Sequence, residues 1–166
     1  MNKEHLFTSR SANNIKTFFL MALFLVGIIF FGFLFSAATG NANYLWGAII
    51  GSLVMNFVSY FFSKKIALST SGAVLADENK YQELHQIVEN LSQKAHIPKP
   101  DVYVINDPGP NAFATGRNQD NAAVAVTTGL LAMMNKNELE GVVAHELSHI
   151  KNKDILIMTV VVVLAG

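Results

Sequence analysis

The sequence predicts an α+β membrane protein: a two-helix transmembrane hairpin, then a polar region with a helix, a small β-hairpin or sheet, and a second helix. Hydrophobic residues make up 51% of the 166 residues and charged residues only 14%, which is too apolar for an ordinary soluble domain. No Asp, Glu, Lys or Arg occurs between Lys16 and Lys64. After Lys64 the charges return, in segments with helical or strand periodicity.

Two apolar runs predict the hairpin, which we place at residues 17–63. The runs cover residues 17–38 and 44–62, and each can cross a hydrocarbon core of about 30 Å as a helix rising about 1.5 Å per residue. The polar stretch TGNAN between them suits a tight turn. A hairpin of this kind leaves both of its ends on one side of the lipid bilayer.

Basic residues flank the hairpin but are absent from its turn: Lys3, Arg10 and Lys16 precede it, and Lys64 and Lys65 follow it. The positive-inside rule therefore predicts a cytosolic amino terminus, residues 1–16, and a cytosolic region, residues 64–154. A cleaved signal peptide is the alternative, because the amino end is basic and SAA follows the apolar stretch. The length of that stretch, its bulky side chains and the second run after it argue against cleavage.

The cytosolic region begins with a connector and an amphipathic helix. We expect KKIALSTSGAVLA to be a loose connector and a helix to run from Asp77 to Ala95, with Asp77 as its cap. The helix is predicted by apolar residues at helical spacing: Tyr81, Leu84, Ile87, Val88 and Leu91. The prolines of IPKP end it. His85 and His96 are interpreted as surface or capping residues.

Short strands and a final helix follow. DVYVI is rich in β-branched residues and predicts a strand, and NAFAT and AAVAVTT, separated by GRNQDN, predict a hairpin. The final helix begins at Asn135 or Asn137, because each is followed three residues later by a glutamate, Glu138 or Glu140, as a capping box requires. It is expected to run towards Asp154.

The final helix carries VVAHELSHIKNKD, which predicts a zinc site. Residues four apart on a helix lie within about 6 Å, so His145 and His149 can bind one Zn²⁺. Zinc lowers the pKa of its water to about 7, and Glu146 can act as the general base that takes the proton. The alternative is a helix with two surface histidines, but unpaired polar groups beside the apolar GVVA are costly. Peptide hydrolysis suits this spacing best.

A catalytic zinc takes three protein ligands, and the sequence offers two. The places three and six residues after His149, which hold Gly and His in one zinc-protein pattern, hold Asn152 and Ile155. Glu138 and Glu140 lie upstream on the same helix, and Asp154 is expected on its far side. The apolar run at residues 155–166 predicts the start of a truncated third transmembrane helix. We therefore expect the third ligand beyond Gly166.

Composition also excludes some functions. The chain has no cysteine, so it holds neither a disulfide framework nor a thiolate zinc site. The formal net charge is +0, and no basic cluster lies outside the membrane flanks, so no nucleic-acid partner is predicted.

Both the HELSH segment and PNAFATGRNQDNAAVAVTTGLL, together with an amino-terminal membrane hairpin, resemble the HtpX family of bacterial heat-shock membrane proteases, which are gluzincins. The resemblance implies a zincin-like catalytic region with one Zn²⁺ per subunit, in a multi-pass protein of the bacterial plasma membrane. His145 and His149 would bind zinc, Glu146 would be catalytic, and a glutamate on a later helix would complete the site. Damaged or misfolded membrane proteins would be cut on the cytosolic side.

NAFAT also resembles the gluzincin edge strand on which substrate backbone is laid. It implies that Asn111, Ala112, Phe113 and Ala114 bind substrate by strand addition. Two other interpretations stay open: a catalytically inactive, truncated membrane zincin that acts as a binding or regulatory protein, and a structural membrane hairpin whose helices associate with neighbours. Metal content and the effect of replacing the histidines distinguish them.

Overall fold

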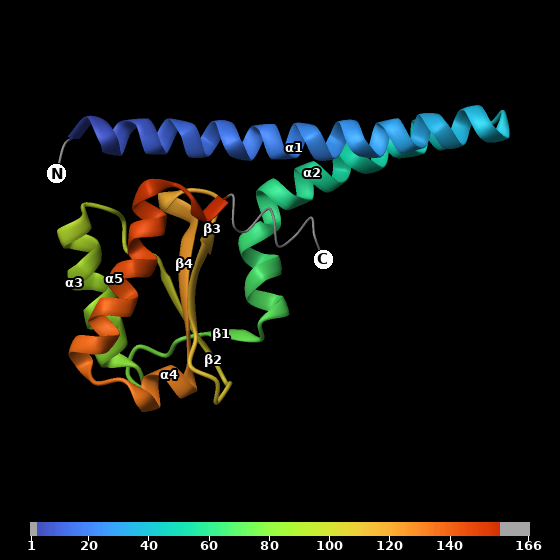
Figure 1. The fold of residues 1–166 in the computed structure, drawn as a ribbon. Coiled ribbons are helices and arrows are strands. Elements are labelled where there is room, and N and C mark those ends of the chain that lie inside the picture. The colour runs from blue at the N-terminus through green and yellow to red at the C-terminus, as the bar shows by residue number, and fades with distance from the viewer. Residues whose placement is uncertain (1–2, 157–166) are drawn as a thin grey trace.

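The computed structural model describes residues 3–156, with side-chain surroundings from Ile15 onward, and begins with a helical hairpin. Helix α1 (Lys3–Thr39) packs along α2 (Asn43–Thr70), as Figure 1 shows. The turn between them contains Gly40 at φ 66°, a left-handed conformation that glycine adopts without steric cost. Both expected apolar runs fall inside these helices, and the expected turn is confirmed.

The surface of this hairpin is apolar. Apart from Val74, Leu75 and Met133, every exposed large hydrophobic side chain of the described residues lies between Ile15 and Phe62. Patches of this size mark a surface that contacts lipid or protein rather than water. The segments Ile15–Thr39 and Asn43–Thr70 are long and apolar enough to cross a membrane.

A small mixed sheet follows the hairpin. Its strands are β1 (Ala73–Leu75), β2 (Asp101–Ile105), β3 (Ala112–Gly116) and β4 (Ala122–Thr127). Their order is β1-β2-β4-β3; β2 and β4 are parallel and the other pairs are antiparallel. The predicted pairing of NAFAT with AAVAVTT is confirmed, with Ala114 opposite Val124. Strand β3 lies at one edge of the sheet.

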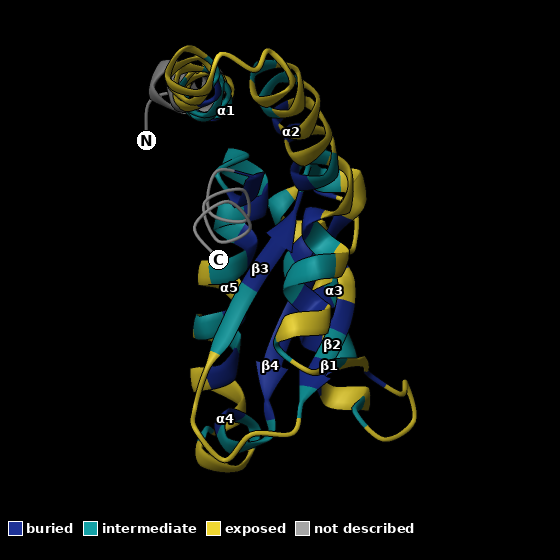
Figure 2. Ribbon diagram, turned by 90° about the vertical axis from the view of Figure 1, so that its right-hand side faces the viewer, coloured by how far each residue is buried: buried dark blue, intermediate teal, exposed yellow. Residues whose placement is uncertain are grey.

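Helices cover both faces of the sheet (Figures 1 and 2). Helices α3 (Gln82–Ala95) and α5 (Lys136–Asn152) pack on each other and on one face, where apolar side chains of both helices and of β2 and β4 form the main core. The end of α2 covers the other face, where Leu68 packs against Ala123 and Ala125. The 3₁₀ turn η1 (Gln119–Asn121) joins β3 to β4, and the short α4 (Thr128–Met133) precedes α5.

The structure corrects the prediction of a loose connector after Lys64. Helix α2 continues to Thr70, and Ala73–Leu75 form β1 on β2. The helix persists because Leu68 is 5% exposed and its burial on the sheet stabilises the last turns. The serines and the glycine of the local sequence indicate a loop. The residues on which Leu68 packs are distant in sequence, so the local pattern does not reveal the helix.

The first helix after the sheet strand β1 also begins later than predicted. Helix α3 starts at Gln82, and the Asp77 carboxylate instead accepts the amides of Asn79 and Lys80 in a preceding turn. His96 is the left-handed carboxyl-terminal cap at φ 55°, as expected. His85 is half-buried, with Nε2 3.0 Å from the Ala76 carbonyl oxygen. The expected third apolar run, apart from Ile155 and Leu156, lies outside the described residues.

Candidate metal centre

Helix α5 positions the zinc motif. Asn135 caps the helix: its side-chain oxygen accepts hydrogen bonds from the backbone N–H groups of Asn137 and Glu138. The Glu138 carboxylate accepts a hydrogen bond from the backbone N–H of Asn135. This complete capping box selects Asn135 over Asn137 as the start. One stripe of α5 is buried in the core: Leu139, Val143, Leu147 and Ile150. Because that stripe fixes the rotation of the helix, it also fixes where the HELSH side chains lie.

The two motif histidines converge. His145 Nε2 lies 3.3 Å from His149 Nε2, and the ring planes cross at 89°. Two nitrogens bound to one tetrahedral Zn²⁺ at about 2.0–2.1 Å each would be about 3.3 Å apart. The spacing of the imidazoles in this structure therefore fits two ligands of one zinc ion.

Asp154 contacts the second histidine, which corrects the prediction that it lies on the far side of the helix. The chain reverses at Lys153, which adopts φ 59°, and Asp154 Oδ2 reaches His149 Nδ1 at 3.0 Å. With the Nδ1 proton donated to this carboxylate, the Nε2 lone pair is free for a metal, an assignment made from the partner atom. The sequence does not indicate this contact, because lysine does not favour the left-handed conformation that turns the chain back.

Glu146 contacts the edge strand. Its Oε2 accepts the Ala114 amide at 3.0 Å, so the carboxylate is held between α5 and β3. This contact was not predicted, since its partners are far apart in sequence. Residues of a strand alternate the side to which they direct their N–H and C=O groups. The backbone groups of Ala112 and Ala114 therefore face the outer edge, where no strand of the described residues pairs with them.

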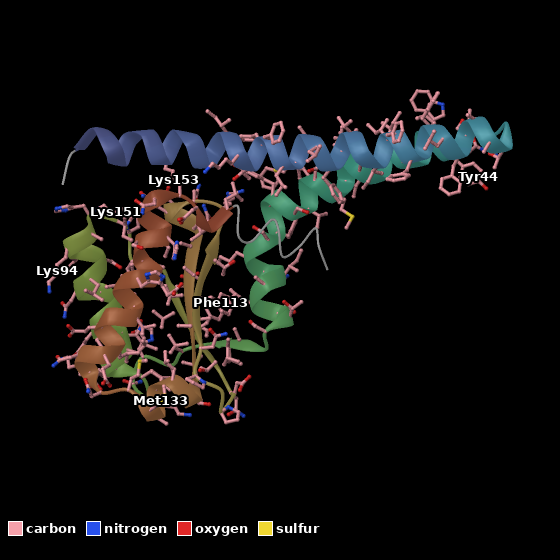
Figure 3. All side chains as sticks on the ribbon, viewed as in Figure 1. Tyr44, Lys94, Phe113, Met133, Lys151 and Lys153 are labelled. Atoms are coloured by element: carbon pink, nitrogen blue, oxygen red, sulfur yellow. The ribbon has the colours of Figure 1, made fainter. Side chains whose placement is uncertain are left out.

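The four predicted substrate residues divide into two kinds. The backbone of Asn111 is hydrogen-bonded to Thr127. The Asn111 carbonyl accepts the Thr127 backbone N–H at 2.9 Å, and the Asn111 N–H donates to the Thr127 hydroxyl oxygen at 2.8 Å. The Phe113 side chain packs with Leu68, Ala123 and Ala125, and Figure 3 shows it between the sheet and α2. Ala112 and Ala114 alone direct backbone groups to the outer edge. Any strand added there would pair with these two.

The described residues bring together two of the predicted metal ligands, His145 and His149. No group of three His, Cys, Asp or Glu side chains in residues 3–156 is arranged to hold a metal ion. Asp154 is bonded to the Nδ1 of a predicted ligand, which is the position of an orienting carboxylate rather than of a third ligand. The expected glutamate beyond Gly166 stays a prediction.

A helix with two adjacent imidazoles and a carboxylate, beside the edge strand of a mixed sheet, is typical of a peptidase. Comparison with known proteins supports this class. Residues 78–165 match Peptidase family M48, just over half of the chain. The chain belongs to this peptidase family.

Among relatives, the chain is similar to proteins named "Protease HtpX homolog". The one from Caldanaerobacter subterraneus subsp. tengcongensis is 47% identical over 168 residues, covering 100% of this chain and 56% of the relative. Those from Campylobacter hominis and Thermococcus sibiricus are 49% and 48% identical, each covering 92% of this chain and 52% and 51% of the relative. The resemblance to HtpX proteins is confirmed. The chain spans about half the length of the curated relatives it matches.

Proposed function

We propose that the protein containing this chain is a zinc metalloendopeptidase of the bacterial plasma membrane that cuts damaged or misfolded membrane proteins on the cytosolic side. The observation that carries the proposal is the 3.3 Å separation of the His145 and His149 Nε2 atoms. Membership of Peptidase family M48 gives the same reaction class. The third ligand, a glutamate, would follow Gly166 in the longer protein.

The chain's own residues supply the remaining chemistry. His145 and His149 would hold the ion through Nε2, with Asp154 fixing the second ring. Bound zinc would supply an activated water and polarise the scissile carbonyl. The Glu146 carboxylate would accept the proton of the water and pass it to the leaving amine. Its contact with the Ala114 amide holds it on the β3 side of the helix.

Edge strand β3 supports a peptide substrate. An extended backbone can pair with the outward groups of Ala112 and with the Ala114 carbonyl by strand addition, since the Ala114 N–H is bonded to Glu146. Both side chains are methyl groups, so recognition would come mainly from backbone hydrogen bonds. This favours loose sequence specificity and cleavage of segments that are already unfolded.

The position of the motif supports membrane substrates. Helix α5 contacts α1, and Figure 3 shows Lys151 and Lys153 at the end of α5 beside α1. The end of α5 that carries His149 therefore lies near α1, the first helix of the hairpin. Exposed loops of membrane proteins would reach it more readily than distant soluble chains.

Glu146→Gln in the full-length protein tests the mechanism. Because general acid–base catalysis contributes about 10²- to 10⁴-fold, we expect cleavage of an unfolded membrane-protein substrate to fall by that factor. Zinc content, measured by elemental analysis, should stay at one equivalent. Glu140→Gln, on the same helix outside the motif, is the matched control and should leave both unchanged.

The same measurements separate the alternatives. Undiminished cleavage by Glu146→Gln would contradict the mechanism. The binding or regulatory interpretation rests on the two-ligand set of the described residues, and it predicts no cleavage even by the wild-type protein. A structural hairpin predicts that replacing both His145 and His149 by alanine leaves metal content unchanged, whereas we expect complete loss of zinc.

A further inference from the structure

A basic cavity whose lining includes neither motif histidine lies where the apolar part of α2 ends. Its volume is about 210 Å³, and it is lined by Phe61, Ser63, Lys64, Lys65, Arg117 and Asn121. Typical small-molecule pockets are larger, about 300 to 1,000 Å³. The lining contains three cationic side chains and no carboxylate. Its size and charge suit a small anionic group.

Two of the three cations have no counter-ion among the residues whose side chains the structure describes. Lys64 is paired with Asp101 at 2.6 Å, but neither Lys65 nor Arg117 forms an ion pair with any described residue. The Arg117 guanidinium lies 5.2 Å from the centre of the Phe61 ring, a cation–π contact that does not neutralise its charge. The cavity thus keeps unneutralised positive charge.

A buried hydroxyl adds a second, independent sign of a ligand. Ser63 is 1% exposed, lines the cavity, and its Oγ has no hydrogen-bond partner among the described residues. Buried polar atoms are usually paired, so this hydroxyl suits an acceptor or donor that enters the cavity. The oxygens of one phosphate group can together accept hydrogen bonds from a hydroxyl, an arginine fork and a lysine ammonium.

The backbone after β3 is folded to build this cavity. Gly116 adopts φ 140°, and a Cβ there would lie 2.3 Å from the Asn121 carbonyl oxygen. Glycine is therefore needed at this position, and the tight return of the chain brings Arg117 and Asn121 to the same side of α2. The cavity therefore lies between α2 and the segment that follows edge strand β3.

The position of the cavity on α2 favours a membrane lipid as the molecule that carries such a phosphate group. Phe61 and Phe62 are 48% and 47% exposed and end the apolar surface of α2, and Lys64 and Lys65 follow after Ser63. A helix that leaves a bilayer passes the phosphate layer at this point. We propose that the cavity binds the phosphate of an anionic phospholipid, with Arg117, Lys65 and Ser63 on the phosphate and Phe61 beside the glycerol. The proposal depends on a membrane location but not on zinc or proteolysis.

Native mass spectrometry of the full-length protein in a non-ionic detergent tests this proposal, with dioctanoyl phosphatidylglycerol as the probe. We expect saturable binding of one lipid, weakened at least tenfold in the Lys65→Gln/Arg117→Gln double variant. Lys94→Gln/Lys136→Gln, which removes two lysines elsewhere, is the control of equal charge and should bind within twofold of the wild type. Lys65→Gln alone, at an exposed position, should weaken binding by a smaller factor and does not disturb the Phe61 contact.

Two competitors identify the ligand class. Dioctanoyl phosphatidylcholine should not displace the anionic probe, and inorganic phosphate should compete only weakly. Equal displacement by inorganic phosphate would overturn the lipid assignment, and equal probe binding by the double variant and the wild type would overturn the site. Glu146→Gln should bind the probe like the wild type, so failure of the proteolytic mechanism and failure of this site are distinguishable.

Discussion

The two sides of helix α5 differ in what they contribute. Leu139, Val143, Leu147 and Ile150 are at most 5% exposed and form part of the main core. His145, Glu146 and His149 lie between these residues in sequence, yet His145 is exposed and the other two are half-buried. One side therefore contributes apolar burial, and the other carries the polar groups.

The difference shows that a helix of a peptidase can position polar side chains for a reaction although its folding depends on other, apolar side chains. Apolar burial fixes the rotation and depth of α5, and the polar side chains then project beside β3 at positions set by the 3.6-residue period. The polar side depends on the apolar side for its geometry, but the reverse dependence is weak. Substitutions on the two sides should therefore have separable effects.

Leu147→Ala gives the largest effect expected on the apolar side. Leu147 is 2% exposed and lies between Glu146 and Ser148 in the motif. Large-to-small substitutions in a core cost about 2–5 kcal/mol, so we expect a clear drop in the thermal unfolding midpoint of the full-length protein in detergent. Zinc content in the cold should stay at one equivalent, because the histidines keep their positions.

The control for this substitution is Val142→Ala, on the same helix at a half-buried position. It should lower the midpoint less. If Leu147→Ala instead abolished zinc binding while the protein stayed folded, the two sides of α5 would not be separable.

The local features of the site follow from the amino-acid sequence, whereas those that depend on residues distant in sequence do not. The 3.6-residue period placed His145 and His149 together, and the spacing of Asn135 and Glu138 predicted the cap. Neither the Glu146 contact with the Ala114 amide nor the burial of Leu68 on the sheet follows from local pattern. Both require knowing which elements pack together.

Chain order also limited the prediction of the sheet. The hairpin of β3 and β4 is local and was predicted from its turn. The parallel pairing of β2 with β4, which puts β3 at the edge, joins strands separated by β3 itself. The Asp154 side chain points towards His149 because Lys153 adopts a left-handed backbone conformation. A lysine at that position does not indicate such a conformation.

Asp154→Asn tests whether the polar side extends past the end of α5. Partners that orient a metal-binding histidine typically account for 10- to 100-fold in metal affinity, so we expect zinc affinity to fall by that factor, measured by competition with a chelator. Asn keeps the size of the side chain but loses the charge that fixes the His149 proton. Asp120→Asn, at an exposed position in η1, should leave affinity unchanged; an equal fall there would mean that general charge, not orientation, is responsible.

Asn135→Ala has the smallest expected effect and tests the start of α5. Loss of an N-cap side chain costs about 1 kcal/mol, because the amides of Asn137 and Glu138 lose their acceptor. Asn137→Ala removes the neighbouring asparagine side chain without touching the cap and should change the unfolding midpoint less. Since the cap lies at the opposite end of α5 from His149, zinc content and cleavage should be the same for both variants and the wild type. A loss of zinc in Asn135→Ala would show that the motif depends on the whole helix rather than on the core stripe beneath it.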